Sequence, residues 1–269
     1  MDVVRCSVPA TTRAPGGRTN AYLIGTQPAI LVDPAARTGE LDRLIDERAV
    51  EHIVLTHTHP DHVGAVDAYA RETNATVWAR YGRTDRFREA TDRHPDRELR
   101  PGTTIQCDDE RVRVLDAPGH ASDHVALEVG ADGPILCGDC AVSEGSVVVA
   151  APEGDMRAYL TTLRRLWAID PPALHPGHGP VIGTPRESLE RLITHRYRRE
   201  RRVLEAVENG AESLEEILEE AYEKDLSGVR DLARATVRAH VEKLAVERRL
   251  EWDGEHATFR RDGRTTRPK

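Results

Sequence analysis

The stretch Thr56-His57-Thr58-His59-Pro60-Asp61-His62 places four metal-ligating side chains within six residues. It follows an apolar run, Ile53 to Leu55, that predicts a strand, and it precedes a segment, Val63 to Arg71, that predicts a helix. Because side chains alternate along a strand, His57 and His59 point to the same side. Imidazole and carboxylate groups suit zinc and related metals. A histidine-rich surface turn is the alternative, but this density of ligands after a buried strand favours a metal site.

Composition favours a globular protein made of one large domain, alone or with a small appendage. The chain has 269 residues, of which 39% are hydrophobic and 31% charged, and a net charge of −8. No apolar run approaches the roughly 20 residues that span a bilayer, and the first residues lack the apolar core of a signal peptide. We therefore expect a cytoplasmic protein without a membrane partner. Any affinity for nucleic acid must come from a local basic patch.

Short strands grouped with helices indicate a layered α/β domain over residues 1–183. Strands are predicted at Val3 to Val8, Ala21 to Ile24, Ile30 to Val32, Ile53 to Leu55, Thr76 to Ala79, Val112 to Leu115, Val125 to Val129, Ile135 to Cys137 and Val147 to Val149. Helical spacing of apolar residues predicts helices from Gly39 to Arg48 and from Asp155 to Ile169. The polar segment from Tyr81 to Arg100 is predicted to be a surface excursion that borders the site.

The pattern changes after Pro185, where helices dominate. A linking helix is predicted within residues 184–208, followed by a winged-helix-like domain over 209–262 and a tail over 263–269. The smaller domain is predicted to contain two helices and a hairpin that turns at Asp253-Gly254, a favoured turn pair. Helix, helix, helix, hairpin is the order of a winged helix-turn-helix.

Three later strand ends each offer one more metal ligand. His120 follows the strand that ends at Leu115, Asp139 follows the strand at Ile135 to Cys137, and His178 follows a short apolar stretch. Loops at strand ends gather in α/β sheets, so these ligands can converge on the first motif. A glycine beside each ligand lets the backbone approach closely.

His57-x-His59-x-Asp61-His62, His120, Asp139 and His178, in that order, resemble the signature of the metallo-β-lactamase superfamily. The resemblance implies an αββα sandwich and a hydrolase with two zinc ions per chain. It implies that His57, His59 and His120 hold the first zinc, that Asp61, His62 and His178 hold the second, and that Asp139 bridges them. Asp33 matches a carboxylate that supports the family's site, and a turn cap is its alternative role.

Further motifs resemble the β-lactamase-like protein 2 group of that superfamily. They are Ala117 to His124, Cys137 to Cys140, Pro176 to Ile182 and His195 to Glu200, with a winged-helix tail. The group includes a single-strand-specific endoribonuclease, so the resemblance implies single-stranded RNA as a candidate substrate.

Two other histidine and cysteine features have structural and functional interpretations. Cys137 and Cys140 have redox spacing, but a disulfide there would strain the loop around Asp139, so packing is favoured. His124 is a candidate catalytic proton source or a partner that orients a ligand, and a structural histidine is the alternative.

Arginines on two predicted helices are candidate phosphate contacts. Those from Arg191 to Arg202 crowd the linking helix, where a solvated linker is the favoured alternative. Arg230, Arg234 and Arg238 share a face, as a recognition helix requires. The preceding helix is acidic, so a packing or dimerisation module is the alternative.

The residues and the resemblance together imply a hydrolase in which a metal-bridging hydroxide attacks phosphorus or a carbonyl carbon and Asp61 orients it. The substrate is predicted to be single-stranded RNA or a small ester or thioester, the latter as in glyoxalase II. A mononuclear iron persulfide dioxygenase shares the first motif. From another class, a nucleic-acid-binding regulator with a metal-sensing domain is the alternative.

Overall fold

Two β-sheets form the body of the protein, whose computed structural model describes residues 1–14, 16–223 and 225–260. The first sheet consists of β1 (Val3–Pro9), β2 (Arg18–Ile24), β3 (Ala29–Val32), β4 (Val50–Val54), β5 (Thr76–Arg80) and β6 (Arg97–Leu99), in that order. The second consists of β11 (Leu174–Pro176), β10 (Ile135–Gly138), β9 (Val125–Val129), β8 (Glu110–Asp116) and β7 (Thr104–Cys107). The helices of this part are α1 (Gly39–Asp46), α2 (Pro60–Val63), α3 (Val66–Thr73), α4 (Thr84–Thr91) and α5 (Met156–Ile169).

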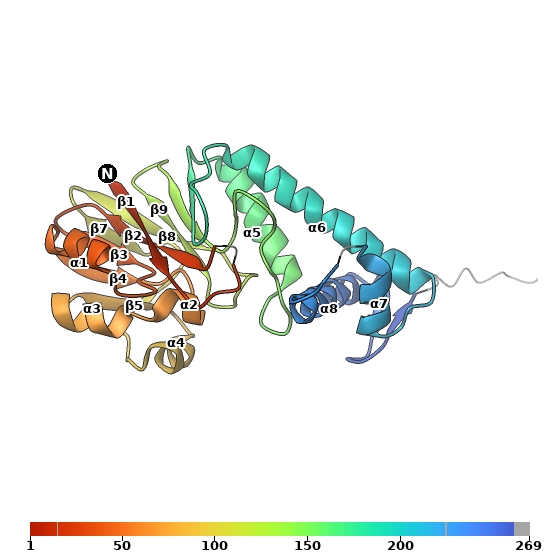
Figure 1. Cartoon of the computed structure of the whole chain (residues 1–269). Helices are drawn as coiled ribbons and strands as arrows, with labels where there is room; N and C mark the ends of the chain where they lie inside the picture. The colour runs from red at the N-terminus through yellow and green to blue at the C-terminus, as the bar shows by residue number, and fades with distance from the viewer. Residues whose placement is uncertain (15, 224, 261–269) are drawn as a thin grey trace, which may run out of the picture.

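The sheets face each other across a shared core, and helices cover their outer faces (Figure 1). Alternation along β2 shows how the sequence builds these layers. Ala21 and Leu23 pack toward α1 and α3, whereas Tyr22 and Ile24 pack toward the second sheet. On the far side, α5 packs against the second sheet. The layers are therefore α, β, β, α, which confirms the predicted fold class.

Three segments differ from the predicted secondary structure. Residues 147–149 lie in a loop and form no strand, so that prediction is wrong. Val147 and Val149 are buried in the core beneath α5, so their apolar pattern reflects loop burial rather than strand pairing. The segment from Tyr81 to Arg100, predicted only as a surface excursion, contains α4 and β6, and β7 was not predicted.

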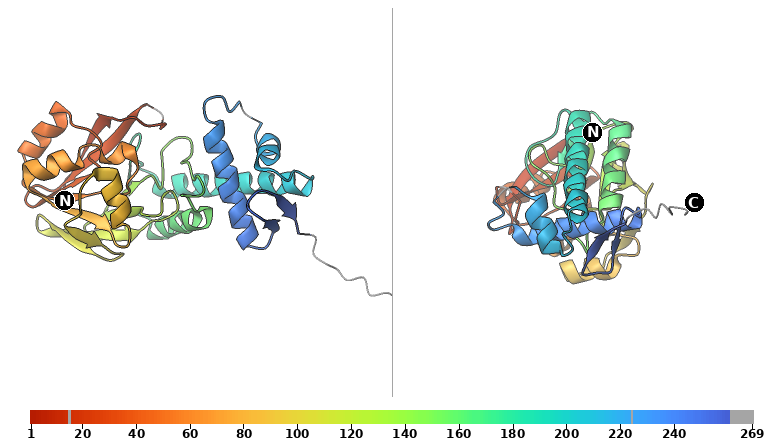
Figure 2. Two further views of the ribbon diagram at one scale, coloured as in Figure 1. Left: turned by 90° about the horizontal axis from the view of Figure 1, so that it is seen from below. Right: turned by 90° about the vertical axis from the view of Figure 1, so that its right-hand side faces the viewer.

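The long helix α6 (Pro185–Glu208) joins the sandwich to the C-terminal segment, residues 209–260. This segment contains α7 (Leu214–Ala221), α8 (Arg230–Val246), β12 (Leu250–Trp252) and β13 (Ala257–Phe259), and Figure 2 shows α8 lying across α6. Leu189 and Leu192 of α6 pack with α5, whereas Val203 and Val207 pack with α7 and α8. No helix in the described ranges is both long enough and apolar enough to span a bilayer.

The predicted order of helices and hairpin is present, but the winged-helix assignment and the domain boundaries stay predictions. Residues 261–269, which include the predicted tail, lie outside the described residues. The C-terminal segment also contacts the loop between β1 and β2, because Arg13 pairs with Asp231 at 2.5 Å and donates to Gly228 O.

A buried charged cluster joins α6 to α8. Lys243 Nζ lies 2.7 Å from Glu200 Oε2, and the fully buried His240 has its Nδ1 3.8 Å from the same oxygen. Such a cluster is costly to bury unless its members stay in the charge states that complement one another. The stability of the junction between α6 and α8 should therefore depend on pH.

Acidification is expected to destabilise the fold through His240. Burial lowers the pKa of His240 from 6.5 to about 4. Between these values the unfolded chain binds more protons than the folded chain, so the free energy of unfolding falls as pH drops through this window. Urea unfolding measured across the window should show a shallower pH dependence for His240→Gln than for the wild type. His94→Gln, at an exposed position, should retain the wild-type slope; equal slopes in all three proteins would contradict this role.

Candidate metal centre

Four strand ends bring the seven predicted ligands together. The motif from His57 to His62 follows β4, His120 follows β8, Asp139 follows β10 and His178 follows β11. The carboxyl ends of these strands meet at one edge of the sandwich, the place where sites in layered α/β proteins gather. The seven side chains form three overlapping groups that could each hold a metal ion. Two of them are described below as the first and second group, and His57, His62 and Asp139 form the third, which overlaps both.

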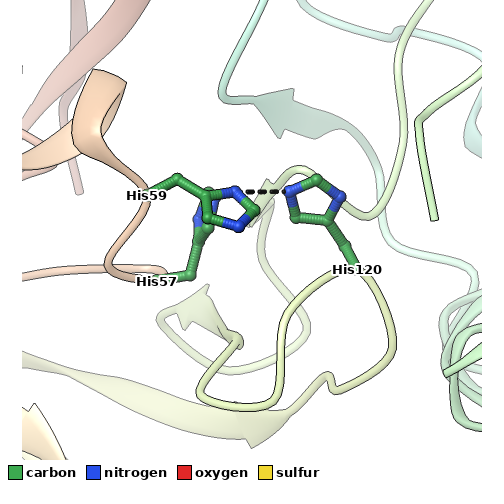
Figure 3. A group of neighbouring side chains, drawn as sticks. All are labelled: His57, His59 and His120. Atoms are coloured by element: carbon green, nitrogen blue, oxygen red, sulfur yellow. Dashed lines mark hydrogen bonds between the residues drawn. The ribbon is translucent and has the colours of Figure 1, made fainter. Parts of the chain in front are cut away.

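The first group consists of His57, His59 and His120 (Figure 3). His59 Nδ1 lies 3.0 Å from His57 Nε2 and 2.9 Å from His120 Nε2. Three nitrogens aimed at one point match the three-histidine set of catalytic zinc sites, which leave a position open. As predicted, His57 and His59 point to the same side.

The second group consists of Asp61, His62 and His178. His178 Nε2 lies 3.5 Å from Asp61 Oδ2 and 3.4 Å from Asp139 Oδ2. Asp139 Oδ2 is also 3.5 Å from His120 Nε2, and Asp139 Oδ1 is 3.7 Å from His62 Nε2. The Asp139 carboxylate therefore lies between the two groups, where a bridging ligand would be.

Two buried atoms show that the donor set suits a cation. Among the described residues, His62 Nε2 and Asp139 Oδ1 are buried and have no hydrogen-bond partner. Unsatisfied buried polar atoms are rare in folded proteins and commonly mark an ion or water that completes the site. Five imidazoles and two carboxylates suit zinc or iron, so the residues fit a pair of such ions.

The other ring nitrogen of each histidine ligand donates to an oxygen, which fixes its orientation and tautomer. The pairs are His57 Nδ1 with Thr56 Oγ1 at 3.1 Å, His59 Nε2 with Glu153 Oε1 at 2.9 Å, His62 Nδ1 with Asp33 Oδ2 at 3.0 Å, His120 Nδ1 with Val148 O at 2.7 Å and His178 Nδ1 with Arg18 O at 2.8 Å. In its neutral form each ring therefore presents a lone pair to the site.

Burial and charge act in opposite directions on these groups. Burial lowers the pKa of His57 well below its usual value, which keeps that ring neutral and able to ligate. Burial also disfavours the charged form of His62, but Asp33, Asp139 and Asp61 outweigh it and raise the pKa of His62 to about 9. The carboxylates thus hold a proton at a place where a metal cation could replace it.

Asp33 supports the site rather than only capping a turn. Its Oδ1 accepts from Thr56 N at 2.7 Å, and its Oδ2 accepts from Thr56 Oγ1 at 2.6 Å as well as from His62. Because the Asp33 side chain is buried, these contacts tie the end of β4 to α2.

Glycines are needed where the ligand loops crowd together, as the sequence indicated. A Cβ at Gly138 would lie 2.6 Å from His124 Nε2 and 2.7 Å from Thr56 Oγ1. A Cβ at Gly177 would collide with Asp139 Oδ1 and lie 2.8 Å from His62 Cε1. These distances are too short for carbon, so a larger residue at position 177 would displace two predicted ligands, and one at position 138 would displace the residues behind them.

His124 is fully buried behind the site. Its Nε2 accepts from Asp139 N at 3.0 Å, and its Nδ1 is 3.6 Å from Cys140 Sγ. This geometry favours orientation of Asp139; the catalytic role of His124 stays a prediction. Cys137 and Cys140 are buried and free, which agrees with packing rather than a disulfide.

Sequence reasoning singled out neither Glu153 nor Arg86, which border the first group, although Arg86 lies in the Tyr81 to Arg100 segment that was predicted to border the site. Arg86 of α4 donates to Thr58 Oγ1 at 2.8 Å and pairs with Glu153 Oε1, the oxygen that also contacts His59. The hydrogen bond from His59 lowers the pKa of Glu153 to about 2, so that carboxylate is ionised. No sequence signal links these residues, because Glu153 lies 94 positions after His59.

The predicted arginine stripe on α6 is largely occupied within the protein. Arg191 donates to the carbonyls of residues 142, 143 and 145, Arg196 is buried against Val147 O, and Arg199 donates to Ala221 O. On α8, Arg230 pairs with Glu215 and Glu219, Arg234 pairs with Glu215, and Arg238 pairs with Glu242.

Comparison with known proteins gives a family match over most of the sandwich. Residues 14–178 match the Metallo-beta-lactamase superfamily. The beta-lactamase-like protein 2 homolog of Drosophila melanogaster is 31% identical over 252 residues, covering 86% of this chain and 84% of that protein. An atrochrysone carboxyl ACP thioesterase of Aspergillus fumigatus is 27% identical over 205 residues, covering 71% of this chain and 60% of that protein.

Two solved structures resemble the chain. TTHA1429, a metallo-beta-lactamase family protein from Thermus thermophilus, has a TM-score of 0.78 at 23% identity and covers 96% of this chain and 98% of its own, so the two share a fold. TTHA1623, solved in a di-iron-bound form, has a TM-score of 0.53 at 30% identity and covers 67% of this chain and 96% of its own.

Gly177→Ala should disrupt the metal centre while the fold persists. The added Cβ would push Asp139 and His62 apart, so we expect the purified variant to retain less metal than the wild type. Gly183→Ala is the matched control, because a Cβ there meets nothing within 4 Å. Metal content by elemental analysis and thermal unfolding of the apoproteins measure the two effects. Wild-type metal content in Gly177→Ala would contradict the crowding argument.

Proposed function

The chain belongs to the metallo-β-lactamase superfamily and is a metal-dependent hydrolase, and on that premise we propose that it holds two zinc ions and hydrolyses thioesters. The observation that carries the dinuclear part is the position of Asp139, whose two oxygens face histidines of both groups. The di-iron-bound TTHA1623, at 30% identity, supports a pair of metals and makes iron the alternative to zinc.

Bound divalent ions lower the pKa of coordinated water and stabilise negative charge that develops on a substrate. The chain's own residues supply the rest. Asp61 is proposed to orient the attacking water, because its partly exposed carboxylate faces His178 while Thr19 Oγ1 holds its main-chain oxygen at 2.7 Å. The histidines would hold the ions, with His57, His59 and His120 at the first position and His62 and His178 with Asp61 at the second.

The thioester is favoured by the relatives and by the placement of the arginines. A relative at 27% identity is named as a thioesterase. RNA binding draws on basic side chains that are available to phosphates, whereas Arg191, Arg196 and Arg199 of α6 donate to the protein's own carbonyls. Occupied guanidinium groups weaken the case for a phosphate-binding face on this helix.

Single-stranded RNA is the second candidate. Its support is the resemblance to the beta-lactamase-like protein 2 homolog, which covers 86% of this chain, together with the exposure of Arg198 and Arg201 on α6. Two further alternatives are a mononuclear iron dioxygenase and a regulator that binds nucleic acid without turnover. Metal counting and a substrate panel distinguish both from a dinuclear hydrolase.

Metal counting and a substrate panel test the proposal together. We expect about two zinc ions per chain, loss of activity on chelation and its recovery with zinc, and release of free thiol from acyl-coenzyme A or S-acyl-glutathione. About one iron per chain would favour the dioxygenase, and cleavage of labelled single-stranded RNA with inert thioesters would favour the endonuclease. Light scattering on the same sample tests for the predicted homodimer.

Asp61→Asn should lower kcat/KM by roughly 100-fold or more, because the carboxylate that orients the nucleophile is removed. Removing a single positioned group from an active site typically has an effect of this size. Asp46→Asn, exposed at the end of α1, is the control and should retain wild-type kinetics. Equal rates in Asp61→Asn and the wild type would remove Asp61 from the mechanism.

A further inference from the structure

One loop supplies the outer partners of two of the three histidines in the first group. This loop, residues 141–155 between β10 and α5, carries Val148 O, which lies 2.7 Å from His120 Nδ1. It also carries Glu153, whose Oε1 lies 2.9 Å from His59 Nε2. The orientation of both imidazole rings therefore depends on the conformation of the 141–155 loop.

The 141–155 loop contains no helix or strand of its own, so contacts from other elements must hold it in place. Arg191 of α6 donates to Gly145 O at 2.6 Å, to Val142 O at 2.9 Å and to Ser143 O at 3.0 Å. These three hydrogen bonds hold the first half of the loop against one guanidinium group. The planar guanidinium carries five N–H donors and can therefore bind several carbonyl oxygens at once.

The second half of the loop is held by buried and main-chain contacts. Arg196 of α6, a buried side chain, donates to Val147 O, the residue before Val148. Ala151 N donates to Ala235 O of α8 at 3.2 Å, two residues before Glu153. The helices that follow the sandwich thus reach the first metal group through a short chain of direct contacts.

We propose that α6 and α8 position the first group of metal ligands through the 141–155 loop, with Glu153 orienting His59 and Arg191 holding the loop. This assigns the C-terminal helices a role in the metal centre that requires no nucleic acid. It rests on the proposed metal site and extends it. Partners of ligand histidines typically change metal affinity by about 10–100-fold when they are removed.

Arg86 completes the arrangement at Glu153. Its guanidinium pairs with Glu153 Oε1 and donates to Thr58 Oγ1 at 2.8 Å, beside the main chain of His59. Asp123, which is buried, accepts from Thr58 N at 3.0 Å and lies 3.4 Å from Arg86 Nε, so it holds the ligand motif together with Arg86. Glu153 is therefore fixed between a cation and the ligand that it orients.

The first test removes the loop's carboxylate. Glu153→Ala should weaken binding of one of the two zinc ions by about 10–100-fold in a titration against a competing chelator and leave the other unchanged. Glu153→Gln, whose amide oxygen can still accept from His59, should recover part of the affinity. Glu144→Ala, exposed in the same loop, is the matched control and should bind zinc as the wild type does.

Imidazole NMR spectra of the metal-free proteins give a second readout. In the wild type His59 should carry its proton on Nε2, and in Glu153→Ala that ring should exchange between tautomers. Unchanged zinc affinity and an unchanged His59 tautomer in Glu153→Ala would overturn the proposal.

The second test removes the hydrogen bonds that Arg191 of α6 donates to the loop. Arg191→Ala should lower the affinity for the same zinc ion, by less than Glu153→Ala does, while Arg198→Ala, exposed on the same helix, should not. If Arg191→Ala lowers the melting temperature but binds both ions normally, Arg191 is only structural and the proposal fails. If the wild type itself binds fewer than two zinc ions, the dinuclear part of the proposed function fails instead. The wild-type titration therefore distinguishes failure of the dinuclear site from failure of the loop proposal.

Discussion

The Asp139 carboxylate is buried among imidazoles of both ligand groups, and the architecture of the site depends on this placement. One oxygen faces His120 and His178, and the other faces His62 without a hydrogen bond. Burying an ionised carboxylate costs several kcal/mol unless opposite charge and good geometry compensate. The imidazoles around the carboxylate can offset that cost when protonated or metal-bound. Gly177 leaves room for the carboxylate, Gly138 leaves room for His124, and the His124 ring accepts from the Asp139 main-chain N–H.

The two ligand groups are supported by different parts of the fold. His62 is held by Asp33 after β3, and His178 by the carbonyl of Arg18 at the start of β2, so the second group depends on the first sheet. His59 and His120 are held by Glu153 and Val148 of the 141–155 loop, so the first group depends largely on a segment without regular structure. A rigid sheet and a tethered loop would respond differently to substitutions in the helices that follow.

The helix α6 illustrates why charge in a sequence is a poor guide to binding. Its arginines have the spacing of a phosphate-binding face. Several of them, however, donate hydrogen bonds to main-chain carbonyls of the sandwich and of the C-terminal segment. A loop that lacks its own ladder of hydrogen bonds leaves carbonyls that need donors, and arginine supplies several at once. The same chemistry that suits a nucleic-acid backbone here serves the protein's own backbone.

The sequence by itself predicted the seven candidate metal ligands and, through the resemblance that their order carries, the αββα fold. Ligand spacing and apolar periodicity are local properties that can be read without a structure. His57, His59, Asp61 and His62 sit within one turn, and the ligands His120, Asp139 and His178 each follow a strand. The tertiary structure alone decided the outer partners. Glu153 contacts His59 although the two residues are 94 positions apart in the sequence. The apolar run at Val147 to Val149 lies in a buried loop rather than in a strand. Such contacts arise from how distant elements pack, and no local pattern records that.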